Sequence, residues 1–337
     1  MTLADPVAIL NGAPGALDPA LVLLAALALD ALIGDPRWLW AALPHPVVLI
    51  GKPIDWLEKK LNRAERGRLD RTIRGAVVVG VVVGVWAAIG WGLHLFFASF
   101  PYGMAAEAAL VAVMLAGRSL YDHVGRVAKA LKTGGAEAGR EAVRHIVGRD
   151  PDQLDRHGVA RSAIESLAEN FADGLVAPAF WYLLLGLPGL FAYKAINTLD
   201  SMLGYKSPRL KAFGLTAARL DDAANYIPAR LSGLLIGIGA AFAPGAAAGR
   251  ALNWMVKESP KHASPNAGWP EAAMAGAYDF ALGGPRRYPG GVSEAAWIGS
   301  GRARLEARDI RRAQRLYVIA CALGWIAVAG VALAGWG

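Results

Sequence analysis

The chain has 337 residues, of which 55% are hydrophobic, a mean hydropathy of +0.35 and a formal net charge of +8. Soluble proteins of this size rarely combine such values, so the composition indicates a membrane protein. The single cysteine, Cys321, excludes a disulfide framework and a cysteine-based zinc site. Nucleic acid is disfavoured as a partner because no aromatic–basic binding motif is present. The positive charge instead fits anionic lipid, a polyanionic substrate or the cation bias of cytoplasmic loops.

The first third of the chain alternates between apolar and basic segments. Residues 20–33 are apolar but short for a membrane span. Residues 37–74 are polar with an excess of Lys and Arg, and their Gly-, Pro- and Trp-rich opening, up to about residue 52, predicts an ordered loop. Residues 75–98 are the clearest transmembrane helix, and a shorter apolar segment at 105–117 completes a helical hairpin.

Residues 118–173 are charged and amphipathic, and they predict three helices separated by glycine-containing breaks. Residues 174–192 are apolar but interrupted by Pro178 and by Leu187-Pro188-Gly189. A full crossing here would carry the following Lys- and Arg-containing stretch to the opposite side of the membrane, against the positive-inside bias. We therefore expect a broken or re-entrant segment, with protein or a wet cavity covering its backbone.

The remainder predicts an apolar helix at 229–248, a basic helix at 302–315 lying at the lipid headgroups, and a last span at about 316–336. The predicted fold is therefore all-α: a polytopic integral membrane protein with about four to six membrane-embedded helices, one of them broken, and cytoplasmic amphipathic helices. We expect a single membrane-embedded catalytic domain over residues 1–337. Its polar active-site segments are predicted at about 30–60, 118–173, 193–230 and 250–315.

The densest polar stretch runs from Tyr193 to Arg230, between two apolar segments. Charged and amide side chains beside a membrane are costly unless water, a metal or a ligand satisfies them. We therefore interpret this stretch as the core of an active site. Capping and buried hydrogen bonds between helices are the plainer alternative. The candidate residues are Lys194, Asn197, Asp200, Ser201, Lys206, Asp221, Asp222, Asn225 and Arg230.

A second candidate set lies on one predicted helix face, where Arg161, Glu165, Glu169 and Asp173 follow one another at intervals of four residues, with Asn170 nearby. A solvated face with one Arg–Glu pair would explain the pattern. However, three like charges in series repel one another unless a cation or a donor joins them. The more specific hypothesis is therefore that this helix face binds magnesium or an amine.

Two loops complete the predicted site. In Ser264-Pro265-Asn266-Ala267-Gly268-Trp269-Pro270-Glu271, prolines and a glycine fix a loop before a helix, and its backbone N–H groups with Ser264 and Asn266 could hold a phosphate. Asp35, in a Gly-Asp-Pro turn, and His45 form the other loop, for which helix capping is the plainer reading. Without a nucleotide-binding, metalloprotease or hydrolase motif, the carboxylates best suit Mg²⁺, an oxygen-seeking ion that bridges to phosphates.

Five motifs resemble one family in the same order: LDALIGDP with HPVVLIGK, ESLAENFADGLVAPAFWY, YKAINTLDSMLGYK, LDDAANYIPARL and SPNAGWPEAAMAGA. They are similar to the CobD/CbiB family of cobalamin biosynthesis, whose members are integral-membrane adenosylcobinamide-phosphate synthases. The resemblance implies an ATP-dependent ligase that joins aminopropanol, or its O-phosphate, to the free carboxylate of adenosylcobyric acid. An acyl phosphate would activate the carboxylate, with Mg²⁺ neutralising the transferred phosphoryl group.

The resemblance also implies roles for the candidate residues. Glu165, Glu169, Asp173, Asp200 and Asp222 are the expected catalytic groups, and Asp200, Asp221 and Asp222 the expected Mg²⁺ ligands. Phosphate and substrate binding is expected from the remaining candidates: Asp35, His45, Arg161, Asn170, Lys194, Asn197, Ser201, Lys206, Asn225, Arg230, Ser264, Asn266 and Glu271. The expected location is the inner cell membrane with the active site facing the cytoplasm, with other corrinoid-pathway enzymes as further partners.

Two other functions stay open. An intramembrane prenyltransferase would also use two Asp-rich motifs to hold a Mg²⁺-diphosphate, although the second motif here lacks a second Asp four residues on. A corrinoid transporter or a scaffold for soluble corrinoid enzymes would suit broken helices. Against a transporter, the polar residues concentrate in loops rather than in the spans.

Overall fold

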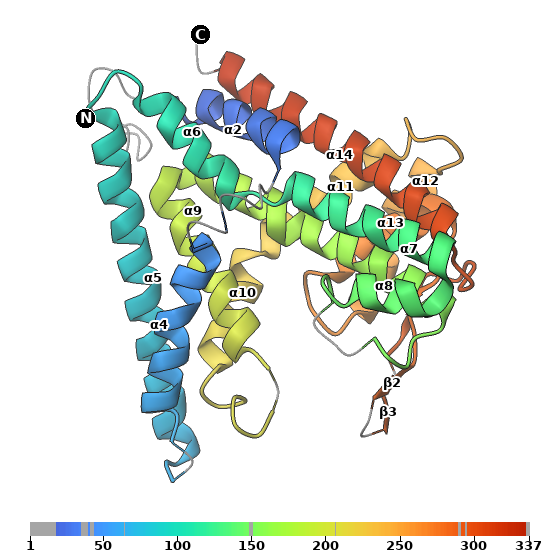
Figure 1. The fold of residues 1–337 in the computed structure, drawn as a ribbon, viewed down its shortest axis with the longest axis horizontal. Helices are drawn as coiled ribbons and strands as arrows, with labels where there is room; N and C mark the ends of the chain where they lie inside the picture. The colour runs from blue at the N-terminus through green and yellow to red at the C-terminus, as the bar shows by residue number, and fades with distance from the viewer. Residues whose placement is uncertain are drawn as a thin grey trace. The chain divides into compact units, whose positions relative to one another are not determined.

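A computed structural model describes most of the chain, which folds into two compact units (Figure 1). The first unit comprises residues 1–116, 177–224 and 328–337, and the second comprises residues 117–176 and 225–327. The described residues are 18–34, 40, 44–63, 65–147, 151–205, 207–288, 291–293 and 295–334.

The first unit is built from helices. They are α2 (Pro19–Ile33), α4 (Pro46–Leu61), α5 (Arg68–Ala98), α6 (Gly103–Met114), α9 (Ala177–Leu203) and α10 (Leu215–Ala224). Helix α5 confirms the predicted span at 75–98, and α6 confirms its hairpin partner. The loop predicted up to residue 52 is wrong from Pro46 onward. Pro46 occupies the first helical position and the His45 Nδ1 accepts the Val47 N–H at 3.2 Å, so this sequence starts α4.

Helix α5 has two distinct faces. Val77, Val81 and Val85, four residues apart, are each more than half exposed, while Val78 and Val82 on the other face are buried. An apolar stripe left exposed along 31 residues, about 46 Å of helix, is what lipid would cover.

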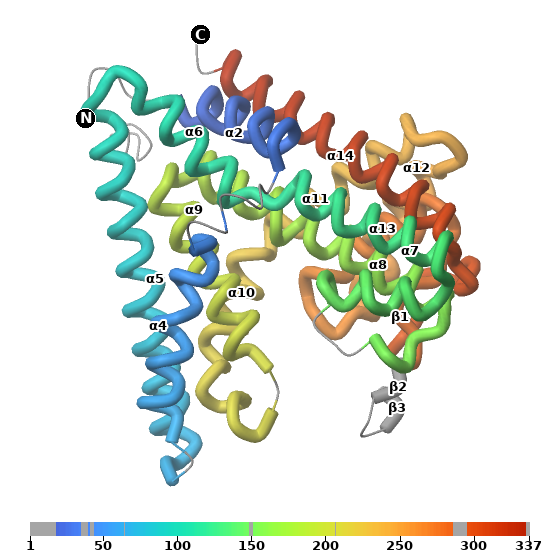
Figure 2. The backbone as a smooth tube through the Cα atoms, viewed as in Figure 1, coloured from blue at the N-terminus to red at the C-terminus, as the bar shows by residue number. Residues whose placement is uncertain are grey.

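Helix α9 is broken, as the sequence predicts. Gly186 has φ 64° and ψ −154°, which is not a helical conformation, and Pro188 lies two residues later. Figure 2 traces the backbone of α9 in yellow-green. Gly90 of α5 packs at the break, where a Cβ would lie 2.7 Å from the Leu187 carbonyl oxygen. The interruption is therefore part of the packing of the first unit. The side of the membrane on which α9 ends stays a prediction.

The second unit is also mainly helical. Its helices are α7 (Gly117–Val143), α8 (Arg156–Phe171), the π-helix η1 (Ala172–Val176), α11 (Tyr226–Gly239), α12 (Ala248–Glu258), the 3₁₀ helix η2 (Ser259–Lys261), α13 (Gly268–Tyr278) and α14 (Ala307–Ala334), of which residues 328–334 belong to the first unit. Two short antiparallel pairs join β1 (Leu282–Gly283) to β4 (Trp297–Ile298) and β2 (Arg286–Tyr288) to β3 (Gly291–Ser293).

Three boundaries in the second unit are informative. The predicted glycine break in α7 is confirmed at Gly135, where φ is 69°. The apolar helix predicted at 229–248 is shorter and ends at Gly239. The prediction of a basic helix beginning at residue 302 is wrong, because the Arg302 backbone instead pairs with Asp279 and Ala281. Helix α14 begins at Ala307 and continues without a break into the last span.

Within the described part of the chain, four helical runs are long and apolar enough to cross a membrane. They are Arg68–Ala98, Gly103–Val143, Arg156–Leu203 and Ala307–Ala334. Pro19–Ile33 and Tyr226–Gly239 are shorter apolar helices. The protein is therefore an all-α polytopic membrane protein, as its composition predicts.

Candidate functional site

In the first unit, the end of α9 and the middle of α10 bring acidic and amide side chains together. The Asn197 Nδ2 lies 3.5 Å from the Asp221 Oδ1, and the negative charges of Asp200 and Asp222 repel each other. All four side chains are partly buried. We call Asn197, Asp200, Asp221 and Asp222 the acidic cluster. Carboxylates that share a partly buried region favour a bound cation or amine.

Two glycines shape the turn that follows α9. A Cβ on Gly204 would lie 1.9 Å from the Asp200 Oδ1, so glycine leaves the space that this carboxylate occupies. A Cβ on Gly214 would lie 1.8 Å from the Leu203 carbonyl oxygen. The chain between α9 and α10 therefore returns directly against the end of α9, which keeps Asp200 near α10.

A polar network on α4 also holds the segment that joins α9 to α10. Glu58 accepts hydrogen bonds from the Arg209 Nε and Nη2 at 2.9 and 2.8 Å and from the Asn62 Nδ2 at 2.7 Å. Burial by itself raises the pKa of Glu58, but these hydrogen bonds outweigh it, and the pKa lies below its usual value. Arg71 donates to the Asn62 Oδ1 at 2.8 Å. Sequence analysis missed Glu58, because its partner Arg209 is 151 residues away.

A second network missed from the sequence lies among the apolar helices of the first unit. Glu107, which is 1% exposed, accepts the Tyr182 hydroxyl at 2.6 Å and lies 3.1 Å from the His94 Nδ1. These contacts join α5, α6 and α9. A carboxylate in such surroundings is tolerated only when its oxygens are hydrogen-bonded.

The other candidates of the first unit have simpler surroundings. The Ser201 hydroxyl donates to the Asn197 carbonyl at 2.8 Å, and Lys194 is partly buried on α9. His45 caps α4, with its ring centroid 4.5 Å from that of Trp40. Asp35 and Lys206 lie outside the described residues.

In the second unit, the α8 face predicted as one site divides into two halves. Glu165 is buried and accepts the Gly283 N–H of β1 at 2.6 Å. Arg161 donates to the Ala303 carbonyl at 2.7 Å and lies 5.4 Å from the centroid of the Trp297 ring. These two side chains anchor neighbouring segments.

The other half of that face is accessible. Glu169 is exposed and Asp173, in η1, is partly exposed. The Asn170 Nδ2 donates to the Ser166 carbonyl of α8 at 2.9 Å. Glu169 and Asp173 are therefore the carboxylates of this face that a substrate can reach.

The predicted phosphate loop is a tightly hydrogen-bonded turn. The Ser264 hydroxyl accepts the N–H groups of Asn266 and Ala267 at 3.2 and 3.3 Å, and the His262 Nδ1 accepts the Ser264 N–H at 3.0 Å. Glu271 is 2% exposed, with its Oε1 3.8 Å from the His262 Nε2. The role of His262 in this turn was not predicted from the sequence; it accepts the N–H of Ser264, two residues further on.

Arg230 lies between two aromatic rings of the second unit. Its guanidinium carbon is 3.4 Å from the centroid of Tyr226 and 4.3 Å from that of Trp269, and its Nη1 donates to the Tyr226 carbonyl at 2.6 Å. Asn225, which precedes α11, is 1% exposed. The stacking fixes the plane of a guanidinium that the sequence predicts to bind phosphate.

Among the described residues, no group of three or more His, Cys, Asp or Glu side chains is placed to hold a metal ion. Mg²⁺, however, commonly takes only one or two protein carboxylates and completes its shell with water and substrate phosphate. The Asp200–Asp222 pair, with its mutual repulsion, fits that mode of binding.

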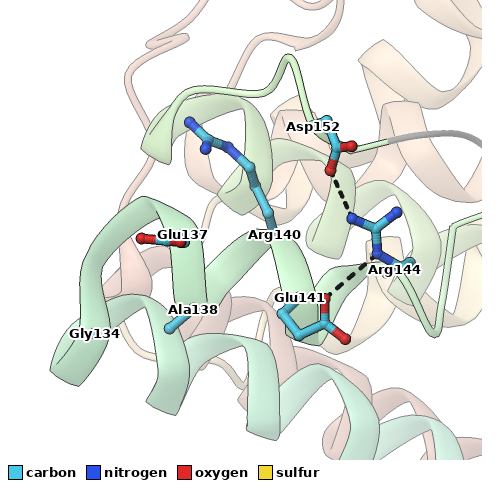
Figure 3. Close-up of a pocket in the computed structure, with 7 residues that line it drawn as sticks. All are labelled: Gly134, Glu137, Ala138, Arg140, Glu141, Arg144 and Asp152. Atoms are coloured by element: carbon cyan, nitrogen blue, oxygen red, sulfur yellow. Dashed lines mark hydrogen bonds and ion pairs between the residues drawn. The ribbon is translucent and has the colours of Figure 1, made fainter.

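An open hollow of about 570 Å³ in the second unit contains none of the predicted site residues (Figure 3). In it, Arg144 pairs with Asp152 at 2.6 Å and with Glu141 at 3.5 Å, while the Arg140 Nε donates to the Leu154 carbonyl at 2.7 Å. Its arginines are therefore already engaged, and we do not assign it to the site.

Comparison with known proteins gives the family. The profile of the CobD/Cbib protein family matches residues 23–317. The chain is 53% identical over 304 residues to cobalamin biosynthesis protein CobD of Sinorhizobium sp, covering 89% of this chain and 94% of the relative. It is 49% identical over 316 residues to CobD of Rhizobium meliloti (93% and 97%) and 43% identical over 317 residues to CobD of Rhodobacter capsulatus (94% and 98%). No solved structure matches. The chain therefore belongs to the CobD/CbiB family of cobalamin biosynthesis proteins.

Proposed function

We propose that this protein joins aminopropanol, or its O-phosphate, to the free carboxylate of adenosylcobyric acid at the expense of ATP. Membership of a cobalamin biosynthesis family supports a corrinoid substrate. The observation that supports the chemical part is the acidic cluster, in which the Asn197 Nδ2 lies 3.5 Å from the Asp221 Oδ1 and Asp200 of α9 interacts electrostatically with Asp222 of α10, which also lies 3.9 Å from the Arg219 Nη1. Such a pair suits a Mg²⁺-bound phosphate better than it suits a purely structural role.

The reaction needs activation, because a carboxylate oxygen is a poor leaving group. Transfer of the terminal phosphoryl group of ATP to the carboxylate gives an acyl phosphate and ADP. The amine nitrogen then attacks the carbonyl carbon, the C–N bond forms, the C–O bond to phosphate breaks, and inorganic phosphate leaves. The proton lost by the amine passes to a carboxylate base.

Residues of each unit have assigned roles in this proposal. Asp200 and Asp222 would hold Mg²⁺, which when bound neutralises charge on the transferred phosphoryl group. Lys194 and Arg230 would bind phosphate oxygens, with Ser264 and Asn266 shaping the loop. Glu169 and Asp173 are the accessible carboxylates for capturing and deprotonating the amine.

The proposed location of the protein rests on its apolar helices. The four apolar helical runs make the protein a membrane protein. We propose that it resides in the inner membrane with its polar segments facing the cytoplasm, where ATP is available. Other corrinoid-pathway enzymes would reach it from that side.

The test is turnover in membranes containing the full chain, with adenosylcobyric acid, each amine, ATP and Mg²⁺, and with product identified by mass. We expect ADP release to match amide formation, and Asp200→Asn and Asp222→Asn each to lower kcat by at least about a hundredfold. Asp55→Asn is the matched control, because Asp55 is an exposed carboxylate of the same unit paired only locally with Lys59. Wild-type turnover in both acidic-cluster variants would overturn the residue assignment. A wild-type protein that forms no amide with either amine would overturn the function.

A further inference from the structure

We propose that α7 and α14 together form a binding surface for anionic phospholipid headgroups. Three hydrogen bonds set the register of these helices. The Tyr317 hydroxyl donates to the Gly117 carbonyl at 2.8 Å, the Gln314 Nε2 to the Tyr121 carbonyl at 2.8 Å, and the Arg311 Nη2 to the Gly125 carbonyl at 3.2 Å. Residue numbers rise along one helix as they fall along the other, so the two run antiparallel (Figure 1).

The register places two changes of polarity at the same level. On α14 the basic turns end at Arg315 and the apolar span begins with Leu316. In the chain that leads into α7 the apolar run ends at Gly117, and the basic turns begin with Arg118. The Tyr317–Gly117 hydrogen bond joins these two points. Both apolar runs end at this level, so it marks the edge of the hydrocarbon.

Six exposed cations lie on the polar side of that level. They are Arg118, Arg126 and Lys129 of α7 and Arg308, Arg311 and Arg315 of α14. At 1.5 Å per residue along the helices, Arg311 and Arg315 lie within about 9 Å of this level, Arg308 and Arg126 about 13 to 14 Å from it, and Lys129 about 18 Å.

The α7 cations adjoin the contact with α14. Positions 117, 121 and 125 make that contact, and 118, 126 and 129 occupy the neighbouring stripe of the helix. In the described residues of this surface two exposed carboxylates offset the charge: Asp122, 3.0 Å from the Arg118 Nε, and Glu306, 3.4 Å from the Arg308 Nε. The surface therefore keeps a positive excess.

Depth and chemistry favour lipid over other polyanions. The cations lie beside an apolar span, at the depth where a bilayer places its phospholipid phosphates. Guanidinium groups also match the geometry of phosphate. Each cation near an anionic membrane surface strengthens the attraction to it. The six cations would therefore select anionic headgroups over zwitterionic ones.

The test measures lipid retained by the full chain. Protein purified with a mixture of phosphatidylglycerol and phosphatidylcholine is analysed by native mass spectrometry, and the affinity for phosphatidylglycerol is obtained by titration. We expect wild type to retain phosphatidylglycerol preferentially, and Arg308→Gln/Arg311→Gln/Arg315→Gln to bind it at least about tenfold more weakly. The control, Lys52→Gln/Arg63→Gln/Lys257→Gln, removes the same charge from exposed positions outside this surface and should bind as wild type does.

Further measurements identify the ligand. Unfolding temperatures in detergent establish that both triple variants are folded, and Arg118→Gln/Arg126→Gln/Lys129→Gln provides a second set from α7. Glycerol 3-phosphate should displace phosphatidylglycerol only weakly, because the free headgroup lacks the anchoring in the bilayer. Equal loss in the surface and control variants, equal retention of both lipids, or displacement by an oligonucleotide at lower concentration than by anionic lipid would each overturn the proposal.

Discussion

Substitution of Gly75 tests whether close backbone packing in the first unit holds the acidic cluster in place. Gly75 of α5 faces the segment that joins α9 to α10. A Cβ there would lie 1.9 Å from the Phe213 carbonyl oxygen, whereas real Cβ atoms essentially never approach within 3.0 Å. Next to it, the Thr72 hydroxyl donates to the Ala212 carbonyl at 3.2 Å, and Phe213 is fully buried. Gly75→Ala must therefore move α5 and this segment apart.

The expected magnitude follows from two opposing effects. Alanine gains up to about 1 kcal/mol over glycine inside a helix. Overpacking against a part of the structure that cannot rotate away costs typically about 1–3 kcal/mol. At Gly80 and Gly84 of the same helix an added Cβ meets nothing within 4 Å, so Gly80→Ala and Gly84→Ala keep only the gain in helix propensity. The difference in unfolding free energy between Gly75→Ala and either control is therefore the overpacking cost alone, about 1–3 kcal/mol.

The assay is unfolding in mixed micelles, with turnover measured in parallel. We expect Gly75→Ala to be less stable than both controls and to lose activity where still folded, because the displaced segment leads directly into α10 with Asp221 and Asp222. Equal stability of Gly75→Ala and Gly80→Ala would refute the packing argument. Lower stability with unchanged turnover would refute the link to the acidic cluster.

Substitutions at three further positions probe individual contacts. The pKa of Glu58 lies below its usual value in the folded protein. The ionised carboxylate therefore stabilises the fold at pH values above its unfolded pKa of about 4.3, and this stabilisation is lost as the pH falls through the folded pKa. Acid unfolding, followed by tryptophan fluorescence, should therefore depend less on pH in Glu58→Gln. Glu271→Ala removes a buried acidic neighbour of His262 and should lower the unfolding free energy by about 1–3 kcal/mol. The stability of Glu271→Gln should lie between those of wild type and Glu271→Ala, and wild-type stability in both variants would contradict this prediction. Arg230→Lys keeps the charge but loses planar stacking on Tyr226, so KM for the phosphate-bearing substrate should rise, and further in Arg230→Met; an unchanged KM in both would exclude phosphate binding by this residue.

The features that the sequence predicts correctly are those with local causes. The span in α5 follows from its unbroken apolar run, and the break in α9 follows from the helix breakers Gly186 and Pro188. Gly135 likewise interrupts α7. Each of these depends on residues within a few positions of the feature itself.

The features that the sequence misses depend on distant partners. The helix predicted from residue 302 starts five residues later, because the Arg302 backbone pairs with Asp279 and Ala281. Glu58 meets Arg209 across 151 residues, and Glu165 meets Gly283 across 118. No periodicity of charge or hydropathy encodes such pairings, so a carboxylate that anchors a strand looks the same in the sequence as one that meets a substrate.

Glu165 and Glu169 show why that distinction matters for the chemistry. Their spacing alone assigns them equal roles on one helix face. Glu165 is buried, and its Oε1 already accepts the Gly283 N–H, so taking a proton at that oxygen would forfeit the hydrogen bond that anchors β1. Glu169 is exposed, so an incoming amine can reach it. A general base must reach the amine and change its protonation state on every turnover. In the proposed reaction, accessibility therefore favours Glu169 and Asp173 as the base, and Glu165 as the residue that holds α8 against β1.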